Sequence, residues 1–252
     1  MAETAAPTAA YMILFMKQWV ADTDEKKAEY YTLMKAAIGE HAKKMCFVGL
    51  ADKTYETGAD CPPNTAVLQF DNMDQARACH KAMPAPAEYV KRDMRLIEGP
   101  ADIFEPGTGY WVAQFEKIID QAKWDKYRDS FLKMNADGYK IDYADGESKR
   151  VSLDLKFLGS SEFLDDAVVG TGNTFLPGVP TDDTGLVIIG KFPDVESAMK
   201  YKECEEYKQS TLEALDMKFT TDEDYYATVK NTICTECWRR DVRIFEVKAP
   251  AA

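Results

Sequence analysis

A strand–turn–helix pattern occurs twice in the sequence and limits the folds that this chain can adopt. The clearer copy spans residues 186–208 and reads LVIIGKFPDVESAMKYKECEEYK, and a weaker copy spans residues 66–91 and reads AVLQFDNMDQARACHKAMPAPAEYVK. Phe70 and Phe192 hold matching positions, 122 residues apart (192 − 70). Because a recurring supersecondary unit indicates duplication, we predict two related halves in one chain.

The same order of elements is predicted in both halves. The first half has strand patterns at residues 11–19, 45–50, 65–70 and 94–97, and helical patterns at residues 25–38 and 72–83. The second half has strand patterns at residues 110–117, 139–143, 185–192 and 242–247, and helical patterns at residues 121–136 and 195–215. The order β-α-β-β-α-β predicts an α+β protein made of two ferredoxin-like repeats.

Composition and turn residues set the boundaries of these repeats. The chain divides into a small, acidic tail, a first repeat, a Pro/Gly linker and a second repeat, at residues 1–10, 11–104, 105–109 and 110–248. The second repeat is longer because it carries two insertions, at residues 145–183 and 216–240. Loops of this length inside a compact domain are usually functional or mobile.

Charge and length exclude some classes of protein. The 252 residues carry a net charge of −12, which argues against binding to a nucleic acid backbone. No apolar run approaches the roughly 20 residues of a membrane-spanning helix. The six cysteines are scattered, which favours reduced thiols over a disulfide framework. We therefore expect a soluble intracellular protein, in the cytoplasm or in an organelle if a targeting peptide has been removed.

Four short motifs of the second half carry a resemblance to a known family. They are GYWVA at residues 109–113, FPDVESA at 192–198, CEEYK at 204–208 and RIFE at 243–246. With these motifs the second half resembles a small bacterial family of uncharacterised dimeric α/β-barrel proteins. The first half is similar more loosely.

The resemblance implies an arrangement of the two repeats. Domains of this superfamily pair sheet to sheet and enclose a barrel, with helices on the outer faces. Two repeats in one chain would then pair with each other as a single-chain dimeric α/β barrel. The wider superfamily includes cofactor-independent monooxygenases, lactone isomerases and haem-binding chlorite dismutases, so the fold alone does not assign a function.

The barrel interior is the first candidate site. Along residues 110–117 the side chains of Tyr110, Gln114 and Glu116 fall on one face of the strand, and this face is less suited to packing under helices. Gln69, Arg95 and Arg243 lie on strands that could join it. A wall of aromatic and polar residues suits a small organic ligand. The alternative is that these polar groups lie near strand ends in water.

Histidines and cysteines give weaker candidates. His41 and His80 are the two histidines, and both have the character of surface positions, so a haem enzyme is disfavoured and we expect no cofactor. Cys234 and Cys237 form a C-x-x-C pair that could bind a metal or act as a redox pair. A structural zinc site needs about four ligands, and no second pair exists, so two partly buried thiols are the favoured interpretation.

The insertions contain apolar side chains that must be covered. Phe157 and Phe175 belong to the first insertion, and Tyr225, Ile233 and Trp238 belong to the second. Exposing such surface is unfavourable by roughly 25 cal/mol per Å². We predict that both insertions pack over the second half, and that they close one barrel end or dock another protein.

Three hypotheses of function follow from these patterns. The first is a non-catalytic protein, either a small-ligand binder or an accessory subunit of a larger assembly. The second is an enzyme resembling the cofactor-independent monooxygenases or isomerases of the superfamily, acting on an aromatic or polyketide-like substrate. The third is a thiol redox or metal protein that uses Cys234 and Cys237.

Overall fold

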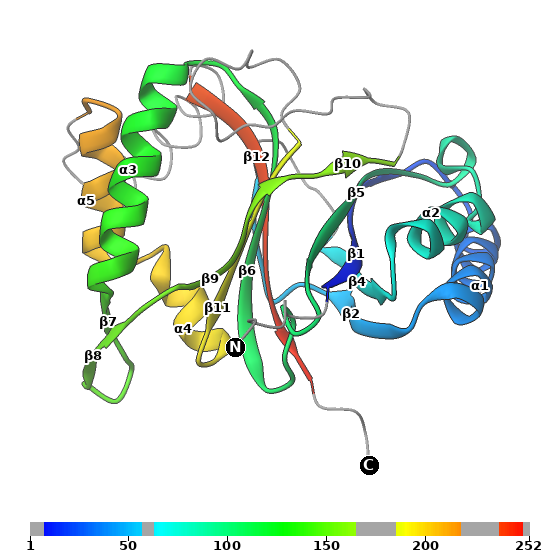
Figure 1. The fold of residues 1–252 in the computed structure, drawn as a ribbon, viewed down its shortest axis with the longest axis horizontal. Coiled ribbons are helices and arrows are strands. Elements are labelled where there is room, and N and C mark those ends of the chain that lie inside the picture. Colours follow the sequence, from blue (N-terminus) through cyan, green and yellow to red (C-terminus); the bar gives the residue numbers. More distant parts are fainter. Residues whose placement is uncertain (1–7, 57–62, 165–184, 218–236, 249–252) are drawn as a thin grey trace, which may run out of the picture. The chain divides into compact units, whose positions relative to one another are not determined.

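The computed structural model describes residues 8–56, 63–164, 185–217 and 237–248, which fall into two compact units (Figure 1). Unit 1 contains the described residues within 1–51, 60–105 and 160–171. Unit 2 contains those within 52–59, 106–159 and 172–252. Neither unit is a continuous stretch of the sequence. The described helices include none that is long and apolar enough to cross a membrane.

Unit 1 has the predicted order of elements. They are β1 (Thr8–Trp19), α1 (Asp24–His41), β2 (Lys44–Leu50), β4 (Asn64–Phe70), α2 (Met73–Ala82), the 3-10 helix η1 (Pro86–Glu88) and β5 (Val90–Pro100). The sheet is antiparallel with the order β10-β5-β1-β4-β2. Without its first strand, this is the strand arrangement of a ferredoxin-like domain.

The helices of unit 1 begin at side chains that cap them. Thr23 accepts a hydrogen bond from the Lys26 amide at 3.3 Å at the start of α1, and Asn72 accepts one from the Gln75 amide at 2.9 Å at the start of α2. Each bond satisfies an amide that the helix itself leaves without an acceptor. The helical pattern predicted at residues 25–38 is longer in the structure, because α1 continues through Gly39 to His41.

Unit 2 repeats this plan with more elements. They are β6 (Thr108–Ile118), α3 (Gln121–Asp137), β7 (Tyr139–Asp142), β8 (Ser148–Val151), β9 (Asp154–Ser160), β11 (Leu186–Phe192), α4 (Val195–Tyr201), α5 (Glu205–Ala214) and β12 (Trp238–Val247). The main sheet has the order β3-β12-β6-β11-β9. The prediction of an α+β protein with two ferredoxin-like repeats is confirmed.

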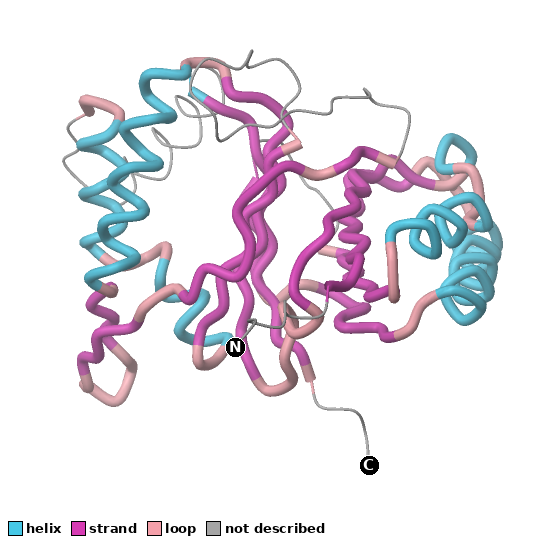
Figure 2. The backbone as a smooth tube through the Cα atoms, viewed as in Figure 1, coloured by secondary structure: helices cyan, strands magenta, loops and turns pink. Residues whose placement is uncertain are grey.

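Each unit keeps its helices on one side of its strands, as Figure 2 shows. The hydrophobic core of each unit lies between that face of the sheet and the helices. In unit 1 the core includes Met12, Leu14, Leu68, Leu96, Tyr30 and Met34. In unit 2 it includes Trp111, Ala113, Phe115, Ile188, Ile244, Trp124 and Phe131.

Residues 139–143 were predicted as a strand of the main sheet, but β7 pairs only with β8, in a separate hairpin. Strand β9, from the segment predicted as an insertion, occupies the sheet position instead. The lack of a side chain at Gly190 of β11 leaves room for Leu153. A Cβ on Gly190 would lie only 1.9 Å from Leu153 Cδ1. Leu153 therefore packs directly against the backbone of β11, immediately before β9 begins.

The helix predicted at residues 195–215 is interrupted. Helix α4 ends at Tyr201, and α5 begins at Glu205 after an N-cap at Cys204. The insertion predicted at residues 216–240 lies mostly outside the described residues, which resume at Cys237.

Each sheet contains one strand from the opposite half of the sequence. Strand β3 (Lys53–Glu56) follows β2 after two residues and pairs with β12 of unit 2. Strand β10 (Glu162–Phe163) follows β9 after one residue and pairs with β5 of unit 1. Both exchanged strands occupy the same place, outside the last strand of the host sheet. No pattern in the sequence predicts this exchange.

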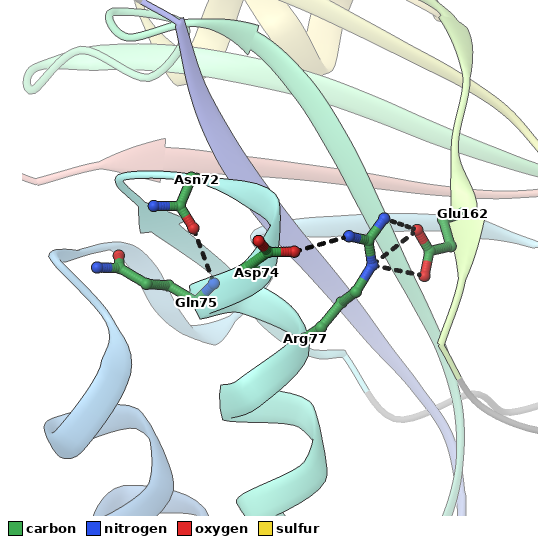
Figure 3. Close-up of polar contacts among 5 residues, drawn as sticks. All are labelled: Asn72, Asp74, Gln75, Arg77 and Glu162. Atoms are coloured by element: carbon green, nitrogen blue, oxygen red, sulfur yellow. Dashed lines mark hydrogen bonds and ion pairs between the residues drawn. The ribbon is translucent and has the colours of Figure 1, made fainter.

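An ion pair holds β10 against a helix of unit 1 (Figure 3). The Arg77 guanidinium of α2 donates from Nη2 to Glu162 Oε2 at 2.7 Å and from Nε to Oε1 at 3.2 Å. Asp74, one turn earlier in α2, lies 3.2 Å from Arg77 Nη1. The amide of Leu164 also donates to the Met94 carbonyl at 3.0 Å. A strand with only two ladder positions is thus held by a side-chain contact as well.

We expect Arg77 and Glu162 to be energetically coupled. Their side chains are 42% and 35% exposed, so solvent weakens the attraction, and the coupling should be about 0.5–1 kcal/mol. A double-mutant cycle with Arg77→Met and Glu162→Gln, followed by urea unfolding, measures it. The matched control is the cycle of Arg77 with Asp74, which is 96% exposed and should show a smaller coupling. Equal coupling in both cycles would contradict the anchoring of β10.

Substitution of two glycines by alanine should change the stability of the protein in opposite directions. A Cβ on Gly109, at the start of β6, would lie 2.3 Å from the backbone oxygen of Asp194, the N-cap of α4. We expect Gly109→Ala to destabilise the protein by about 1–3 kcal/mol, because backbone cannot move aside like a side chain. Gly39 lies in α1 with no atom within 4 Å of its Cβ position. Gly39→Ala should stabilise by about 0.5–1 kcal/mol. Chemical denaturation of both variants measures these changes.

Candidate functional site

The face of the unit 2 sheet that points away from the helices carries a group of polar residues. On β6, Trp111, Ala113 and Phe115 belong to the hydrophobic core. Because side chains alternate along a strand, Tyr110 and Gln114 lie on the opposite face. Both side chains are buried. The structure thus separates these strand residues in the way that the alternation predicted.

The register of the neighbouring strands extends this face into three rows. Gln114 lies between Asp241 of β12 and Val187 of β11, in the first row. Val112 lies between Arg243 and Ile189 in the second row, and Tyr110 lies between Phe245 and Lys191 in the third row. We refer to these nine residues as the unit 2 grid.

A buried ion pair crosses two rows of the unit 2 grid. Arg243 donates from Nη2 to Asp241 Oδ2 at 3.1 Å, and both side chains are 0% exposed. The two residues are two positions apart on one strand, so their side chains share a face. Removing two charges from water is costly, and a buried ion pair contributes little net stability. The pair fixes a guanidinium beside Gln114 and close to the stacked rings of Tyr110 and Phe245, whose centroids are 6.2 Å apart.

Unit 1 carries an equivalent set of rows, the unit 1 grid. Its rows are Asp93–Phe15–Thr65, Arg95–Ile13–Val67 and Ile97–Tyr11–Gln69. Arg95 donates to Asp93 from Nε at 2.9 Å and from Nη2 at 2.8 Å. The Tyr11 hydroxyl donates to the Pro100 carbonyl at 2.7 Å, and the Gln69 amide donates to the Ala101 carbonyl at 3.0 Å. Those two side chains therefore hold the segment that follows β5.

Of the candidate residues from the sequence, Tyr110, Gln114 and Arg243 share the unit 2 grid. Gln69 and Arg95 share the unit 1 grid, so they lie in another compact unit. Glu116 is exposed and lies where the register skips a residue, since Arg240 is opposite Phe115 and Arg239 is opposite Lys117. This β-bulge interrupts the alternation that placed Glu116 beside Gln114.

Three polar or aromatic residues of the unit 2 grid, Asp241, Lys191 and Phe245, were not identified from the sequence, although a signal for one of them was present. The pattern Asp-x-Arg precedes both final-strand motifs, as Asp93 and Arg95 and as Asp241 and Arg243, each 148 residues apart (241 − 93; 243 − 95). This repeat could have identified Asp241. Lys191 and Phe245 carry no such signal, because only the register brings them beside Tyr110.

The helix-facing core of unit 2 encloses a second buried guanidinium. Arg240 donates to the hydroxyls of Tyr127 at 3.1 Å and Tyr207 at 3.2 Å, and these hydroxyls lie 3.0 Å apart. Its guanidinium also lies 5.7 Å from the ring centroid of Trp238. Since Tyr127 belongs to α3 and Tyr207 to α5, Arg240 connects both helices to β12. Its surroundings indicate a role in packing.

Buried tyrosines of the same core keep their protons. Burial raises the pKa of Tyr139 and of Tyr201, whose hydroxyls lie 3.4 Å apart. Their rings meet edge to face, with centroids 4.6 Å apart. Both side chains are therefore neutral at physiological pH, and they join the β7–β8 hairpin to α4 through packing.

Neither histidine lies on a strand of either sheet. His80 belongs to α2, and His41 is the last residue of α1, 4.0 Å from the Glu40 carboxylate. The C-x-x-C pair is only half described, because Cys234 lies outside the described residues, whereas Cys237 is buried in the unit 2 core. Within the described ranges, no group of three or more His, Cys, Asp or Glu side chains could hold a metal ion.

The two described thiols of unit 1, Cys46 and Cys79, are shielded from reaction. Burial raises the pKa of Cys46 to about 11 and that of Cys79 to about 11. Burial also raises the pKa of Cys204 in unit 2. The thiolate is the nucleophilic form, so a raised pKa keeps these groups unreactive until the pH approaches that value.

We expect Cys46 and Cys79 to react slowly with dithionitrobenzoate at pH 8. With pKa values of about 11, roughly one thiol in a thousand is ionised at that pH, and burial limits access as well. The same residues in guanidinium chloride should react at least about a hundred times faster. Mass spectrometry of the labelled peptides assigns the rates to each residue. Fast labelling of either thiol in the native protein would contradict the burial.

Comparison with known proteins gives remote matches to solved structures. No family model and no curated protein matches the sequence. A DypB variant of Rhodococcus jostii RHA1 in complex with haem has 12% identity and a TM-score of 0.41, over 97% of this chain and 95% of that chain. A mutant chlorite dismutase of Candidatus Nitrospira defluvii has 12% identity and a TM-score of 0.37, over 81% and 86% of the two chains. These low values transfer no activity to this protein.

One expectation about cofactors is corrected by these matches. No cofactor was expected from the sequence, but the Rhodococcus protein is in complex with haem. We therefore do not assign the absence of a cofactor to this chain. The grids carry no histidine that could serve as an axial ligand, and we derive no reaction step through a haem group.

Proposed function

We propose that the unit 2 grid binds a small aromatic or polyketide-like molecule, and that the protein acts on it in a monooxygenase-like or isomerase-like reaction. The observation that carries this proposal is the Asp241–Arg243 ion pair, buried on the sheet face opposite the hydrophobic core. An ion pair contributes little to stability there. A role in recognition accounts for it better than a role in packing.

The residues of the unit 2 grid have complementary roles in this proposal. The stacked rings of Tyr110 and Phe245, both fully buried, would supply the aromatic contacts of the site. The amide of Gln114 can donate or accept a hydrogen bond and would orient the molecule. Arg243, held by Asp241, would stabilise negative charge that develops on a substrate oxygen, as fixed donors do in water-excluded sites. Tyr110 carries the hydroxyl that would move a proton.

A non-catalytic small-ligand binder, or an accessory subunit of a larger assembly, is the second candidate. It is favoured by the position of both histidines on helices of unit 1, away from the strands. The same grid would then hold a ligand without changing it. Its partner surfaces would include residues 145–183 and 216–240, although the first range also supplies β9 to the sheet.

We expect native mass spectrometry of gently purified protein to detect a bound small organic molecule. The double variant Asp241→Asn/Arg243→Gln should lose it, because both charges of the buried ion pair are removed without leaving one of them buried alone. The matched control is Asp93→Asn/Arg95→Gln in unit 1, which should keep it. Retention of the ligand by a folded unit 2 variant would refute the proposed site.

Turnover separates the enzyme from the binder. The released molecule is added back to the purified protein, and its mass and the uptake of oxygen are followed over time. A changed mass or an isomerised product supports the enzyme. If the molecule is recovered unchanged and in full, and the wild-type protein still binds it, the result supports the non-catalytic binder. A titration of free thiols before and after turnover tests the remaining hypothesis, a thiol redox function.

A further inference from the structure

One edge of the unit 1 sheet exposes apolar side chains. Strand β2 is the last strand in the sheet order β10-β5-β1-β4-β2, so among the described strands it pairs with β4 alone. Met45 is 64% exposed, Val48 56% and Leu50 63%, and these are the most exposed large apolar side chains that the structure describes. An uncovered strand of this kind is a template for pairing with another chain.

The three exposed side chains lie on one face of β2. Met45 is opposite Leu68 of β4, and Val48 is opposite Ala66. Leu68 and Ala66 belong to the hydrophobic core of unit 1, and directly opposite residues share a face of the sheet. Leu50 follows Val48 by two residues and therefore has the same orientation. The apolar face of the sheet thus continues at β2 to a place where solvent reaches it.

The equivalent edge of unit 2 is protected. Strand β9 is the last strand of its sheet, beside β11, as β2 is beside β4. It carries Lys156, which lies 2.7 Å from the Asp154 carboxylate, and its apolar side chains are half-buried. Charged side chains on an edge strand oppose pairing with another chain. Residues 45–50 of β2 include no charged residue. The duplicated fold therefore guards this edge in unit 2 and leaves it open in unit 1.

The exposed residues of β2 are self-complementary about Val48. In an antiparallel pair of β2 strands, Val48 can lie opposite the Val48 of a second copy. The register with β4 skips Cys46, so Met45 takes the next place and lies opposite Leu50 of that copy. Each exposed apolar side chain then meets an apolar partner on the same face. Such a two-fold pairing uses one surface twice and closes at two copies.

The charges at the two ends of β2 also suit an antiparallel pair of copies. Lys44 begins β2, and Asp52 follows the strand after one residue, and both are exposed. In the register centred on Val48, Lys44 of each copy lies opposite Ala51 of the other, next to Asp52. The two Lys44 residues are three ladder positions on either side of the axis, about 20 Å apart. Solvent ions screen their repulsion at that distance.

We propose that two copies of this chain associate through β2, with the strands antiparallel about a two-fold axis at Val48. The unit 1 sheet then continues from one copy into the other. The pairing covers Met45, Val48 and Leu50 and supplies hydrogen-bond partners to the open edge. This inference is independent of the proposed function, because β2 contributes no residue to the unit 2 grid.

Sedimentation equilibrium measures the association. The wild-type protein should show a monomer–dimer equilibrium. Val48→Lys should raise the Kd of the dimer at least about tenfold, because two like charges would face each other at the axis. The matched control is Leu132→Lys, which adds the same charge at an exposed apolar residue of α3 and should leave the Kd unchanged. Urea unfolding of both variants checks that they fold.

Disulfide crosslinking tests the register. Val48→Cys should give a linked dimer on mild oxidation, because opposite Cα atoms of an antiparallel pair lie about 4.5–5.5 Å apart, within the span of a disulfide. Met45→Cys and Leu50→Cys should not link when oxidised separately, since each residue lies about 13 Å from its own copy. A mixture of the two variants should link. The wild-type protein and Leu132→Cys give the background from the native cysteines.

Four results would overturn the proposal. The first is a wild-type protein that stays monomeric in a concentration series extending into the high micromolar range. The second is a dimer that Val48→Lys leaves intact, because such a dimer forms through another surface. The third is a dimer that Val48→Lys dissociates but that Val48→Cys does not link, which contradicts the axis at Val48. The fourth is an assembly larger than a dimer, because a two-fold pairing leaves no further β2 edge open.

Discussion

The register of β6 with its two neighbours is the constraint on which unit 2 depends. It directs Trp111, Ala113 and Phe115 toward the helices, and Tyr110 and Gln114 to the opposite face. A slip of one residue would exchange the two faces and place charged groups in the hydrophobic core. The bulge at Glu116 then resets the alternation, so that Phe115 and Ile118 both belong to the core although they are three residues apart.

The same bulge occurs in unit 1, and this shows how closely the two halves correspond. There the register skips Lys17, since Met16 is opposite Arg92 and Gln18 is opposite Lys91. The duplicated chain has thus kept its backbone irregularity, its buried Asp–Arg pair and its tyrosine. Retained bulges re-aim side chains at the end of a strand. Here the bulge marks the limit of each grid, so the two grids have the same size.

Local patterns in the sequence were sufficient for the strands and helices of the repeats, because alternation and helical spacing are properties of neighbouring residues. The strand predicted at residues 110–117 is observed as Thr108–Ile118, for example. Patterns could not show which strands pair. Residues 139–142 form a strand as predicted, yet β9 takes the place beside β11 in the sheet, next to the contact of Leu153 with Gly190. The candidate site shows the same limit. Tyr110 and Gln114 followed from alternation, whereas Lys191 joins them only through register.

The exchanged strands have a consequence for how the protein is made. The sheet of unit 1 is completed by Glu162 and Phe163, so its last strand, β5, lacks its outer neighbour until those residues have left the ribosome. Domains generally fold as units in the order of their synthesis. This chain departs from that order. The outer edge of β5 stays unpaired while some sixty further residues, after Pro100, are translated. Uncovered edges invite pairing with other chains. The speed of translation between Pro100 and Glu162 therefore sets how long each nascent chain is exposed to misassembly.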